Sequence, residues 1–500
     1  MAATERSIRT LLVANRGEIA VRVMQTCAER GIRTVAVYSD PDAAALHVRT
    51  ADEAHRVGPA ASAESYLVQD RIIEAAKASG ADAIHPGYGF LSENAGFAER
   101  CEQEGILFVG PTPHAIRVMG DKTEARKLMA EAGVPMAPGT TDAIDDLDEA
   151  ERIAQGIGYP VLIKAAAGGG GKGMRVVEEE AEFRRAMEAA QREAQNAFGD
   201  ARVYIEKYLV GPRHIEIQVL ADQHGNTVYL FERECSIQRR HQKVVEEAPS
   251  AALTPELRRA MGETAVRAAE ACGYVGAGTV EFLLDANGDF YFLEMNTRLQ
   301  VEHPVTEEIT GLDLVAEQLR IAEGEELGYG QEDLKIDGHA IECRVYAEDV
   351  PAGFLPNPGP LHRHRAPSGP GIRVDTGVTE GDEVPVFYDP MIAKLTVHAP
   401  TREQAIDKMD RALADYEIAG VSTTIPFCRF VMQHDAFRSG GFDTGFVGTH
   451  FTPEMHQSVP EAMAEVAALA AVLATERMAG GPSAPTPAIQ PQSPWTLRRA

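Results

Sequence analysis

Apolar and polar positions alternate over the first 120 residues in a way that predicts strands and helices by turns. Residues 8–38 predict an apolar strand, a turn at Asn15–Gly17, a helix with apolar residues at helical spacing, and a second strand. Further along, a glycine-rich loop leads into a helix whose predicted N-cap is Ser92 or Asn94. This order predicts the start of a doubly wound, Rossmann-like α/β layer, in which loops at strand ends bind ligands.

The pattern changes near Asp121, where a helix is predicted that ends at Gly133 and Pro135. The stretch "YPVLIKAAAGGGGKGMRVV", residues 159–177, predicts two strands joined by four consecutive glycines. We expect an antiparallel hairpin with the glycines 168–171 at its tip, and such a tip can close over phosphates as a lid. A flexible surface turn is the commoner role of a glycine cluster.

Two familiar phosphate-binding motifs do not fit this glycine run. In the pattern G-x-x-x-x-G-K-[ST], Gly173 stands where a hydroxyl is required, and Ala166 stands where the first glycine is required. The dinucleotide fingerprint also fails, because no acidic residue stands where a ribose partner should follow. The glycine run by itself therefore does not identify a ligand.

The last third of the chain predicts further strands at 339–349 and 388–399 and a helix at 401–415. We therefore expect an architecture of α/β and α+β type that ends in a mixed β-sheet domain. An alanine-rich helix at 460–478 and a low-complexity stretch at 480–494 follow. The expected domains are 1–120, 121–330 with the lid at about 135–210, 331–447, and a tail at 448–500.

Composition narrows the class of protein. The chain has 500 residues, 44% of them hydrophobic, and no apolar stretch approaches the ~18 residues of a membrane span. Its 75 acidic and 48 basic residues give a formal charge of −27, which argues against nucleic acid or an anionic membrane as the main partner. The same charge leads to the hypothesis that the protein works in high salt. The absence of a signal-peptide pattern predicts a cytoplasmic protein. Six scattered cysteines without a C-x-x-C pair indicate neither a zinc site nor a disulfide framework.

The most informative segment, residues 279–304, predicts a pair of facing carboxylates. Asn287–Gly288 is the strongest short signal for a hairpin with a two-residue turn, and in that register the numbers of paired residues sum to 575. Glu281 then faces Glu294, and a divalent cation would relieve their repulsion. With Asn296 one pleat further on the same face, this oxygen-only set suits Mg²⁺ shared with substrate phosphates. A solvated hairpin or a different register is the alternative.

Three polar residues follow the second strand of this hairpin at alternate positions. Arg298, Gln300 and Glu302 would point to one side of a strand or an extended loop. An arginine can bind a small planar oxyanion with two hydrogen bonds, and a carboxylate beside it can act as a general base. The alternative is a salt-bridged edge strand.

A basic cluster lies at residues 239–243, where two arginines and a histidine precede Lys243. Such clusters are usually solvated, but acidic residues flank this one on both sides, which suits a site for an anion. Lys122 and Lys164 are candidates for phosphate contacts for the same reason, because each lies at the end of a predicted element.

Several longer motifs occur in a fixed order: ANRGEIA, HPGYGFLSEN, MGDK, KAAAGGGGKGM, RHIEIQV, CSIQRRHQKVVEEAP, EMNTRLQVEHPVTE and YDPMIAKL. In this order the sequence resembles the biotin carboxylase family of ATP-grasp enzymes from residue 8 to about residue 447. The resemblance implies that ATP and bicarbonate give carboxyphosphate, which yields CO₂ to carboxylate N1′ of biotin. It further implies an N-terminal biotin carboxylase domain, an ATP-grasp domain with a glycine-rich lid hairpin, and a C-terminal biotin carboxylase domain.

The resemblance also implies roles for individual residues. ATP would be bound by Lys122, Lys164, Gly169, Gly170, Gly171, Glu206, Lys207, Leu209, His214, Gln238 and His241. Mg²⁺ or Mn²⁺ would be held by Glu281 and Glu294, with Asn296 close by. Bicarbonate would be held by Lys243, Arg298, Gln300 and the backbone of Val301. Glu302 would remove the proton from bicarbonate, and Arg344 would stabilise the biotin enolate.

The partners implied by the resemblance follow from what the sequence lacks. No Met-Lys-Met biotin attachment motif occurs, so biotin is expected on a separate carrier protein and the carboxyl transfer on carboxyltransferase subunits. A homodimer is expected, and the tail 448–500 is a hypothetical docking segment for these partners.

Residues 373–395 resemble acyl-CoA carboxylase α subunits, which favours an acetyl- or propionyl-CoA carboxylase. The alternatives are a pyruvate carboxylase, another ATP-grasp ligase and a non-catalytic nucleotide-binding partner.

Overall fold

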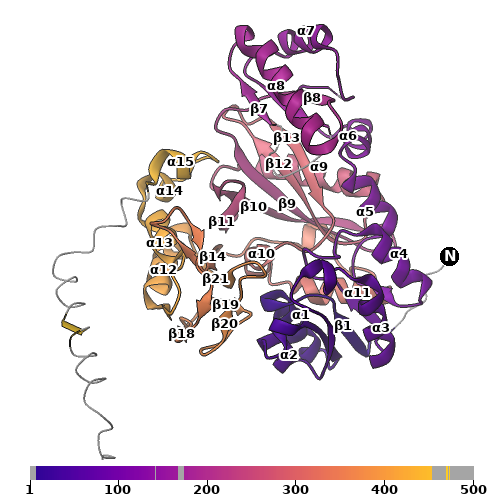
Figure 1. Ribbon diagram of the computed structural model, residues 1–500, viewed down its shortest axis with the longest axis vertical. Helices are drawn as coiled ribbons and strands as arrows, with labels where there is room; N and C mark the ends of the chain where they lie inside the picture. Colours follow the sequence, from indigo (N-terminus) through magenta and orange to yellow (C-terminus); the bar gives the residue numbers. More distant parts are fainter. Residues whose placement is uncertain (1–6, 141, 167–173, 453–468, 471, 473–500) are drawn as a thin grey trace, which may run out of the picture. The chain divides into compact units, whose positions relative to one another are not determined.

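The computed structural model describes residues 7–140, 142–166, 174–452, 469–470 and 472. The chain divides into two compact units, Met1–Phe451 and Thr452–Ala500. In the second unit, the described residues 469–470 and 472 are helical, and the low-complexity stretch lies outside the described residues. The strands and helices labelled in Figure 1 belong to the first unit. Among the described residues, no helix is long and apolar enough to cross a membrane.

The N-terminal part is a five-stranded parallel sheet in the order β3-β2-β1-β4-β5. Its strands are β1 (Thr10–Val13), β2 (Arg33–Ser39), β3 (Glu53–Gly58), β4 (Ala83–His85) and β5 (Leu107–Phe108). The helices between them include α1 (Gly17–Glu29), α3 (Gln69–Ser79) and α4 (Ala95–Gln103). Strands β2 and β3 lie on one side of β1, and β4 and β5 lie on the other, as in a doubly wound fold. The Rossmann-like prediction is therefore confirmed. The side chain of Asn94 accepts a hydrogen bond from Phe97 N, which makes Asn94 the N-cap of α4.

A second sheet has eight strands, in the order β13-β12-β9-β10-β11-β14-β21-β19 (Figure 1). Its strands are β9 (Arg213–Ala221), β10 (Thr227–Arg239), β11 (Gln242–Ala248), β12 (Gly276–Leu284), β13 (Phe290–Asn296), β14 (His339–Tyr346), β19 (Ile372–Thr376) and β21 (Met391–Ala399). All its pairs are antiparallel. Because β11 pairs with β14, strands from the expected ATP-grasp and C-terminal domains form one continuous sheet. The helices that pack on it include α9 (Pro255–Ala271), α10 (His303–Thr310) and α12 (Arg402–Asp415).

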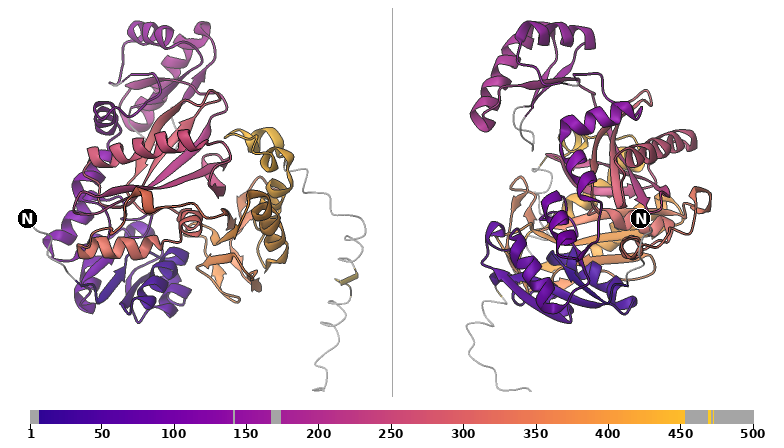
Figure 2. Two further views of the ribbon diagram at one scale, coloured as in Figure 1. Left: turned by 180° about the vertical axis from the view of Figure 1, so that it is seen from behind. Right: turned by 90° about the vertical axis from the view of Figure 1, so that its right-hand side faces the viewer.

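A lobe with its own buried core lies between these two sheets in the sequence (Figure 2). Its three strands, in the order β7-β6-β8, are β6 (Val161–Ala165), β7 (Arg175–Val177) and β8 (Val203–Lys207), and its helices are α7 (Leu147–Ile157) and α8 (Glu180–Phe198). β6 and β7 pair antiparallel, which confirms the predicted hairpin. The glycine tip of that hairpin, with Gly169, Gly170 and Gly171, lies outside the described residues.

The β12–β13 hairpin reaches its predicted pairing by an unexpected route. Glu281 faces Glu294, as predicted. The predicted two-residue turn is wrong, because Leu284 pairs with Phe290 and the loop is closed by a five-residue turn over 285–289. This turn shifts the register by one residue, and a bulge next to Glu281 shifts it back. The two register shifts cancel, so Glu281 and Glu294 face each other although the predicted turn does not form.

Candidate active site

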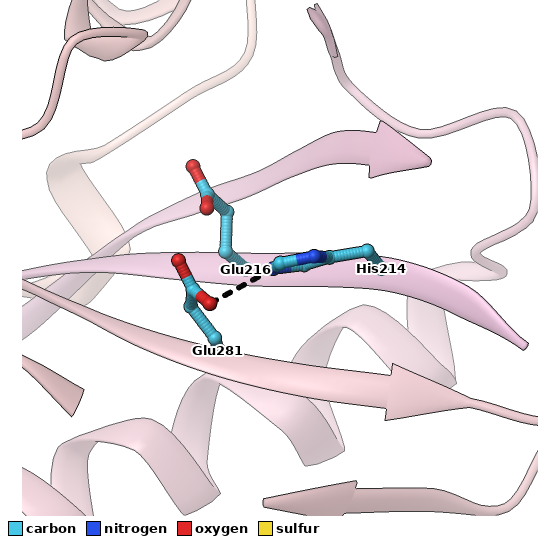
Figure 3. A group of neighbouring side chains, drawn as sticks. All are labelled: His214, Glu216 and Glu281. Carbon is cyan, nitrogen blue, oxygen red and sulfur yellow. Dashed lines mark ion pairs between the residues drawn. The ribbon is translucent and has the colours of Figure 1, made fainter. Parts of the chain in front are cut away.

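Three carboxylates lie in one row across neighbouring strands. Glu216 of β9 pairs with Glu281 of β12, which pairs with Glu294 of β13. Glu216 and Glu281 are 0% and 5% exposed, and they lie on one face of the sheet with His214 beside them (Figure 3). His214 Nε2 is 3.1 Å from Glu281 Oε2. Like charges in register repel, so the row requires cations.

Lys243 of β11 supplies one of these cations. Its Nζ donates hydrogen bonds to Glu216, to Glu281 at 2.9 Å and to Glu302 at 2.5 Å. Burial would lower the pKa of Lys243, but the three carboxylates raise it well above its ordinary value. Burial would raise the pKa of Glu281, but Lys243 and His214 hold it well below its ordinary value. Lys243 and Glu281 are therefore both charged at neutral pH.

Glu302 lies between two cations at the start of α10. Its Oε1 accepts a hydrogen bond from Lys243, and its Oε2 accepts one from Arg344 Nη2 at 2.9 Å. Burial would raise the pKa of Glu302, but Lys243, Arg344 and Arg233 lower it well below its ordinary value. Arg344 is held in turn by Glu246, whose Oε1 accepts from Nε at 2.6 Å. An ionised carboxylate in this position can accept a proton from a bound ligand.

Arg233 of β10 is a part of the site that the sequence analysis missed. Its side chain is fully buried, and its nitrogens donate hydrogen bonds to Glu216, Gln218, Thr279, Gln300 and Thr306. Gln300 donates in turn to Glu281 Oε1 at 2.9 Å. Arg233 thus connects the carboxylate row to the loop before α10.

Glu216 was also missed, although the sequence contains a signal for it. In "RHIEIQV", alternate positions place His214, Glu216 and Gln218 on one face of the strand and isoleucine or valine on the other. An apolar face opposite three polar side chains indicates a strand that packs on a core with one face and lines a polar site with the other.

The segment 297–302 is a loop, and the side chains of Arg298, Gln300 and Glu302 all lie near Glu281. Arg298 donates to Glu93 at 3.0 Å and to Asn296 Oδ1 at 2.8 Å. The carbonyl oxygen of Val301 accepts from Lys394 Nζ at 3.0 Å. Glu93 was not predicted from the sequence; it follows the glycine-rich loop of the N-terminal sheet and brings that sheet to the site.

Two of the residues predicted to bind ATP form an ion pair in the lobe. Lys164 of β6 is 2.6 Å from one oxygen of Glu206 on β8, and Arg126 of helix α6 (Lys122–Glu131) is 2.6 Å from the other. Lys207 donates from Nζ to two backbone carbonyls of the same lobe. Leu209, two residues after Lys207, is half-buried.

Two other predicted ATP residues lie at the carboxylate row. Gln238 Nε2 is 2.7 Å from His214 Nδ1. Glu294 as a residue is exposed, yet desolvation of its carboxyl group and the neighbouring Glu281 raise its pKa, against the lowering effect of Lys122. Two facing carboxylates, one of which raises the pKa of the other, are a donor set that a divalent cation fits. Asn296 lies close by and donates to Glu281 Oε1 at 3.0 Å.

His241 lies in a strained turn between β10 and β11. Arg239 pairs with Gln242, so Arg240 and His241 alone form the turn, with φ of 49° and 69°. Positive φ at both central residues is the geometry that normally selects Asn-Gly. Residues other than glycine that have a positive φ carry backbone strain, and such strain clusters at functional sites.

Curated relatives and solved structures cover most of the chain. It is 58% identical over 454 residues to a pyruvate carboxylase subunit of Methanothermobacter thermautotrophicus, with 90% of this chain and 92% of the relative covered. It is 54% identical over 444 residues to biotin carboxylase 1 of Bacillus subtilis, covering 89% and 99%. A solved biotin carboxylase complex from Campylobacter jejuni superposes with a TM-score of 0.85 at 47% identity, covering 89% of this chain and 99% of that one.

Three family models match the chain in order. They are the biotin carboxylase N-terminal domain over residues 7–116, the ATP-binding domain of the carbamoyl-phosphate synthase L chain over 121–329, and the biotin carboxylase C-terminal domain over 342–449. The fold and the site define an ATP-grasp ligase. The chain belongs to the biotin carboxylase family, as its sequence motifs predicted.

Proposed function

We propose that the chain carboxylates biotin on a separate carrier protein, with bicarbonate as the carbon source and carboxyphosphate as the intermediate. The observation that carries this proposal is Glu302, a buried carboxylate whose two oxygens contact Lys243 and Arg344. A base held ionised between two cations can take a proton from an anion that the same cations bind.

The first steps take place at the bicarbonate site. Its oxygens are held by Lys243, Arg298, Gln300 and the backbone N–H of Val301. Glu302 takes the bicarbonate proton, the freed oxygen attacks the γ-phosphorus of ATP, and the bond to the β-phosphate oxygen breaks to release ADP. Carboxyphosphate then splits into CO₂ and phosphate. Phosphate takes the N1′ proton of biotin, Arg344 stabilises the enolate, and N1′ forms its bond to CO₂.

ATP binds between the lobe and the carboxylate row in this proposal. Its ligands are Lys122, Lys164, Glu206, Lys207, Leu209, His214, Gln238 and His241, with Gly169, Gly170 and Gly171 of the hairpin tip closing over the phosphates. Glu281 and Glu294 hold Mg²⁺, with Asn296 near them, and the cation supplies positive charge to the transferring phosphoryl group. The support is the facing pair and the raised pKa of Glu294.

The test is ADP release by the purified chain with Mg²⁺-ATP and bicarbonate, with and without free biotin. We expect release that requires bicarbonate and is stimulated by biotin. If ATP binds but neither free biotin nor an added biotinylated carrier domain stimulates release, biotin is not the acceptor and the proposal is wrong.

We further propose that the carboxylated carrier serves an acetyl- or propionyl-CoA carboxylase. The likeness to the propionyl-CoA carboxylase alpha chain of Ruegeria pomeroyi, 53% identical over 486 residues and covering 71% of that relative, supports this. Pyruvate carboxylation is a second candidate, favoured by the 58% identity to the pyruvate carboxylase relative from Methanothermobacter. Reconstitution with carrier and carboxyltransferase subunits, supplied in turn with acetyl-CoA, propionyl-CoA and pyruvate, separates the two.

A homodimer is also proposed, because a 51% identical biotin carboxylase domain from Hydrogenobacter thermophilus was solved as a dimer.

A further inference from the structure

Two glutamates that take no direct part in the proposed reaction, Glu246 and Glu342, face each other next to Arg344. Glu246 of β11 pairs directly with Glu342 of β14, and directly opposed residues have their Cβ atoms about 5 Å apart. Both are fully buried. One oxygen of each is bonded: Arg344 Nε donates to Glu246 Oε1 at 2.6 Å, and Thr396 Oγ1 donates to Glu342 Oε2 at 3.0 Å.

The other oxygen of each carboxylate is buried without a hydrogen-bond partner among the described residues. These two atoms are Glu246 Oε2 and Glu342 Oε1. One proton held between them would satisfy both and remove one of two like charges, as paired carboxyl groups do in other proteins. We propose that Glu246 and Glu342 share one proton, and that the single negative charge left on the pair positions Arg344 beside Glu302.

The surrounding charges support one retained proton. The charged groups that face the pair are Arg344 of β14, Glu302 before α10, Lys243 of β11 and Lys394 of β21. Burial raises the pKa of Glu246 to about 7, against the lowering effect of Arg344. Burial also raises the pKa of Glu342 well above its ordinary value, with a further rise from Glu246 and a lowering by Lys394. The two groups titrate as a pair that keeps at least one proton at neutral pH.

The role of the pair, unlike the shared proton, rests on the proposed function, in which Arg344 stabilises the biotin enolate. Arg344 is fixed at two points, with Nε on Glu246 and Nη2 on Glu302. A planar guanidinium held at two points keeps a defined orientation. When the pH falls below the pKa of Glu246, the pair gains a second proton and Nε loses its charged partner. Turnover should therefore fall on the acid side.

Infrared spectroscopy of the full chain tests the shared proton without using activity. At pH 7 we expect an absorption band of a buried protonated carboxylic acid, and we expect both E246Q and E342Q to shift or remove that same band. The matched control is E247Q. Glu247 is the next residue on β11 and is also buried, but His339 and Arg402 outweigh burial and lower its pKa, so it is ionised and has no such band to lose. A missing band, or one that only one of the two substitutions affects, overturns the shared proton.

Biotin-stimulated ADP release as a function of pH tests the positioning of Arg344. E246Q removes the charge at Nε, and we expect kcat to fall by about tenfold or more while KM for ATP stays within about twofold. E342Q replaces the shared proton with an amide hydrogen, which is a weaker donor to the Glu246 carboxylate, so the pKa of Glu246 and with it the acid limb of kcat should move by about one pH unit to higher pH. An unshifted limb in E342Q, or a normal kcat in E246Q, overturns the positioning role. A wild-type chain without biotin-stimulated release refutes the proposed function instead and leaves the infrared result standing.

Discussion

Lys243 and Arg344 contact the two oxygens of Glu302 and decide the charge of that residue. Burial by itself favours a neutral carboxylic acid, which could not accept a proton. The two cations reverse this effect and hold the pKa of Glu302 well below its ordinary value. A carboxylate that is ionised at neutral pH needs no separate deprotonation before it accepts a proton, and its loss should affect chemistry more than binding.

The substitution E302Q tests this at the scale of one residue. Glutamine keeps the size of the side chain and an oxygen for Lys243, but it cannot take a proton. We expect kcat for biotin-stimulated ADP release to fall by about 10²–10⁴-fold, while calorimetric titration with Mg²⁺-ATP gives an affinity close to that of the wild type. Turnover at the wild-type rate would remove Glu302 from the role of base.

Arg233 allows a second test, directed at stability. Its guanidinium bonds to Glu216 and to four other polar side chains in a fully buried position. R233M leaves Glu216 with one cation fewer, and breaking a buried pair in this way costs about 3–5 kcal/mol. We expect the urea midpoint of unfolding to fall accordingly. R56M is the control, because Arg56 pairs with Asp40 at the surface and its loss should change the midpoint little. Equal shifts in the two variants would contradict this account.

At the scale of elements, the alternation of polar and apolar residues was enough to predict the strands that carry the site. It was not enough to predict the turn between β12 and β13, and the facing of Glu281 and Glu294, which was predicted from that turn, is right only because two register shifts cancel. The carboxylate of Asp285 accepts hydrogen bonds from the backbone N–H groups of Asn287 and Asp289, and this closes a longer loop than Asn287–Gly288 would alone. A side chain that competes for backbone donors is not visible in hydrophobic periodicity.

The neighbours of Glu216 and Arg233 across the sheet could not be predicted from the sequence for a different reason. Their roles depend on which strands lie side by side, and β9 lies between β12 and β10, which are distant from each other in the chain. The register that sets Glu216 opposite Glu281 is a tertiary pairing. Local patterns fix the face on which a residue lies, but not its neighbour across the sheet.

The turn between β10 and β11 gives a prediction at this scale. Arg240 has a φ of 49°, a conformation that asparagine adopts more readily than arginine. R240N should raise the free energy of unfolding by about 1 kcal/mol, measured by urea denaturation. R239N is the contrast: Arg239 has ordinary strand geometry, donates to the carbonyl of Gly353 and lies over the Phe354 ring, so its loss should destabilise. A destabilised R240N would show that the turn is not strained.

At the scale of the whole molecule, the formal charge of −27 should make stability depend on salt. Excess like charge destabilises a compact state through self-repulsion, and the screening length falls from about 10 Å at 0.1 M salt to about 3 Å at 1 M. Between these two KCl concentrations we expect the unfolding temperature to rise by several degrees, because buried pairs such as Lys243–Glu302 are screened little. KCl is preferred to sulfate, which strengthens hydrophobic burial by itself. A midpoint insensitive to KCl would count against the high-salt hypothesis.

The division of the chain at Phe451 leads to a last prediction. Phe451 is 7% exposed, and its ring packs against those of Phe354, Phe427 and Phe430 at centroid distances of 5.7, 5.0 and 5.4 Å. The residues proposed for the reaction all precede it. A chain ending at residue 452 should therefore keep the wild-type unfolding midpoint and biotin-stimulated ADP release. A chain ending at residue 449 loses this aromatic packing and should be less stable by about 3 kcal/mol.

The same pair of truncations tests the hypothesis that the tail docks to partners. The chain ending at 452 is folded in this account, so any loss of complex formation with carrier and carboxyltransferase subunits, followed by size-exclusion chromatography, belongs to the removed segment and not to unfolding. Complexes that assemble with this truncated chain as they do with the full one would assign partner binding to the first unit. The shorter chain shows how much loss of assembly results from destabilisation alone, since it lacks the same tail and also part of the core.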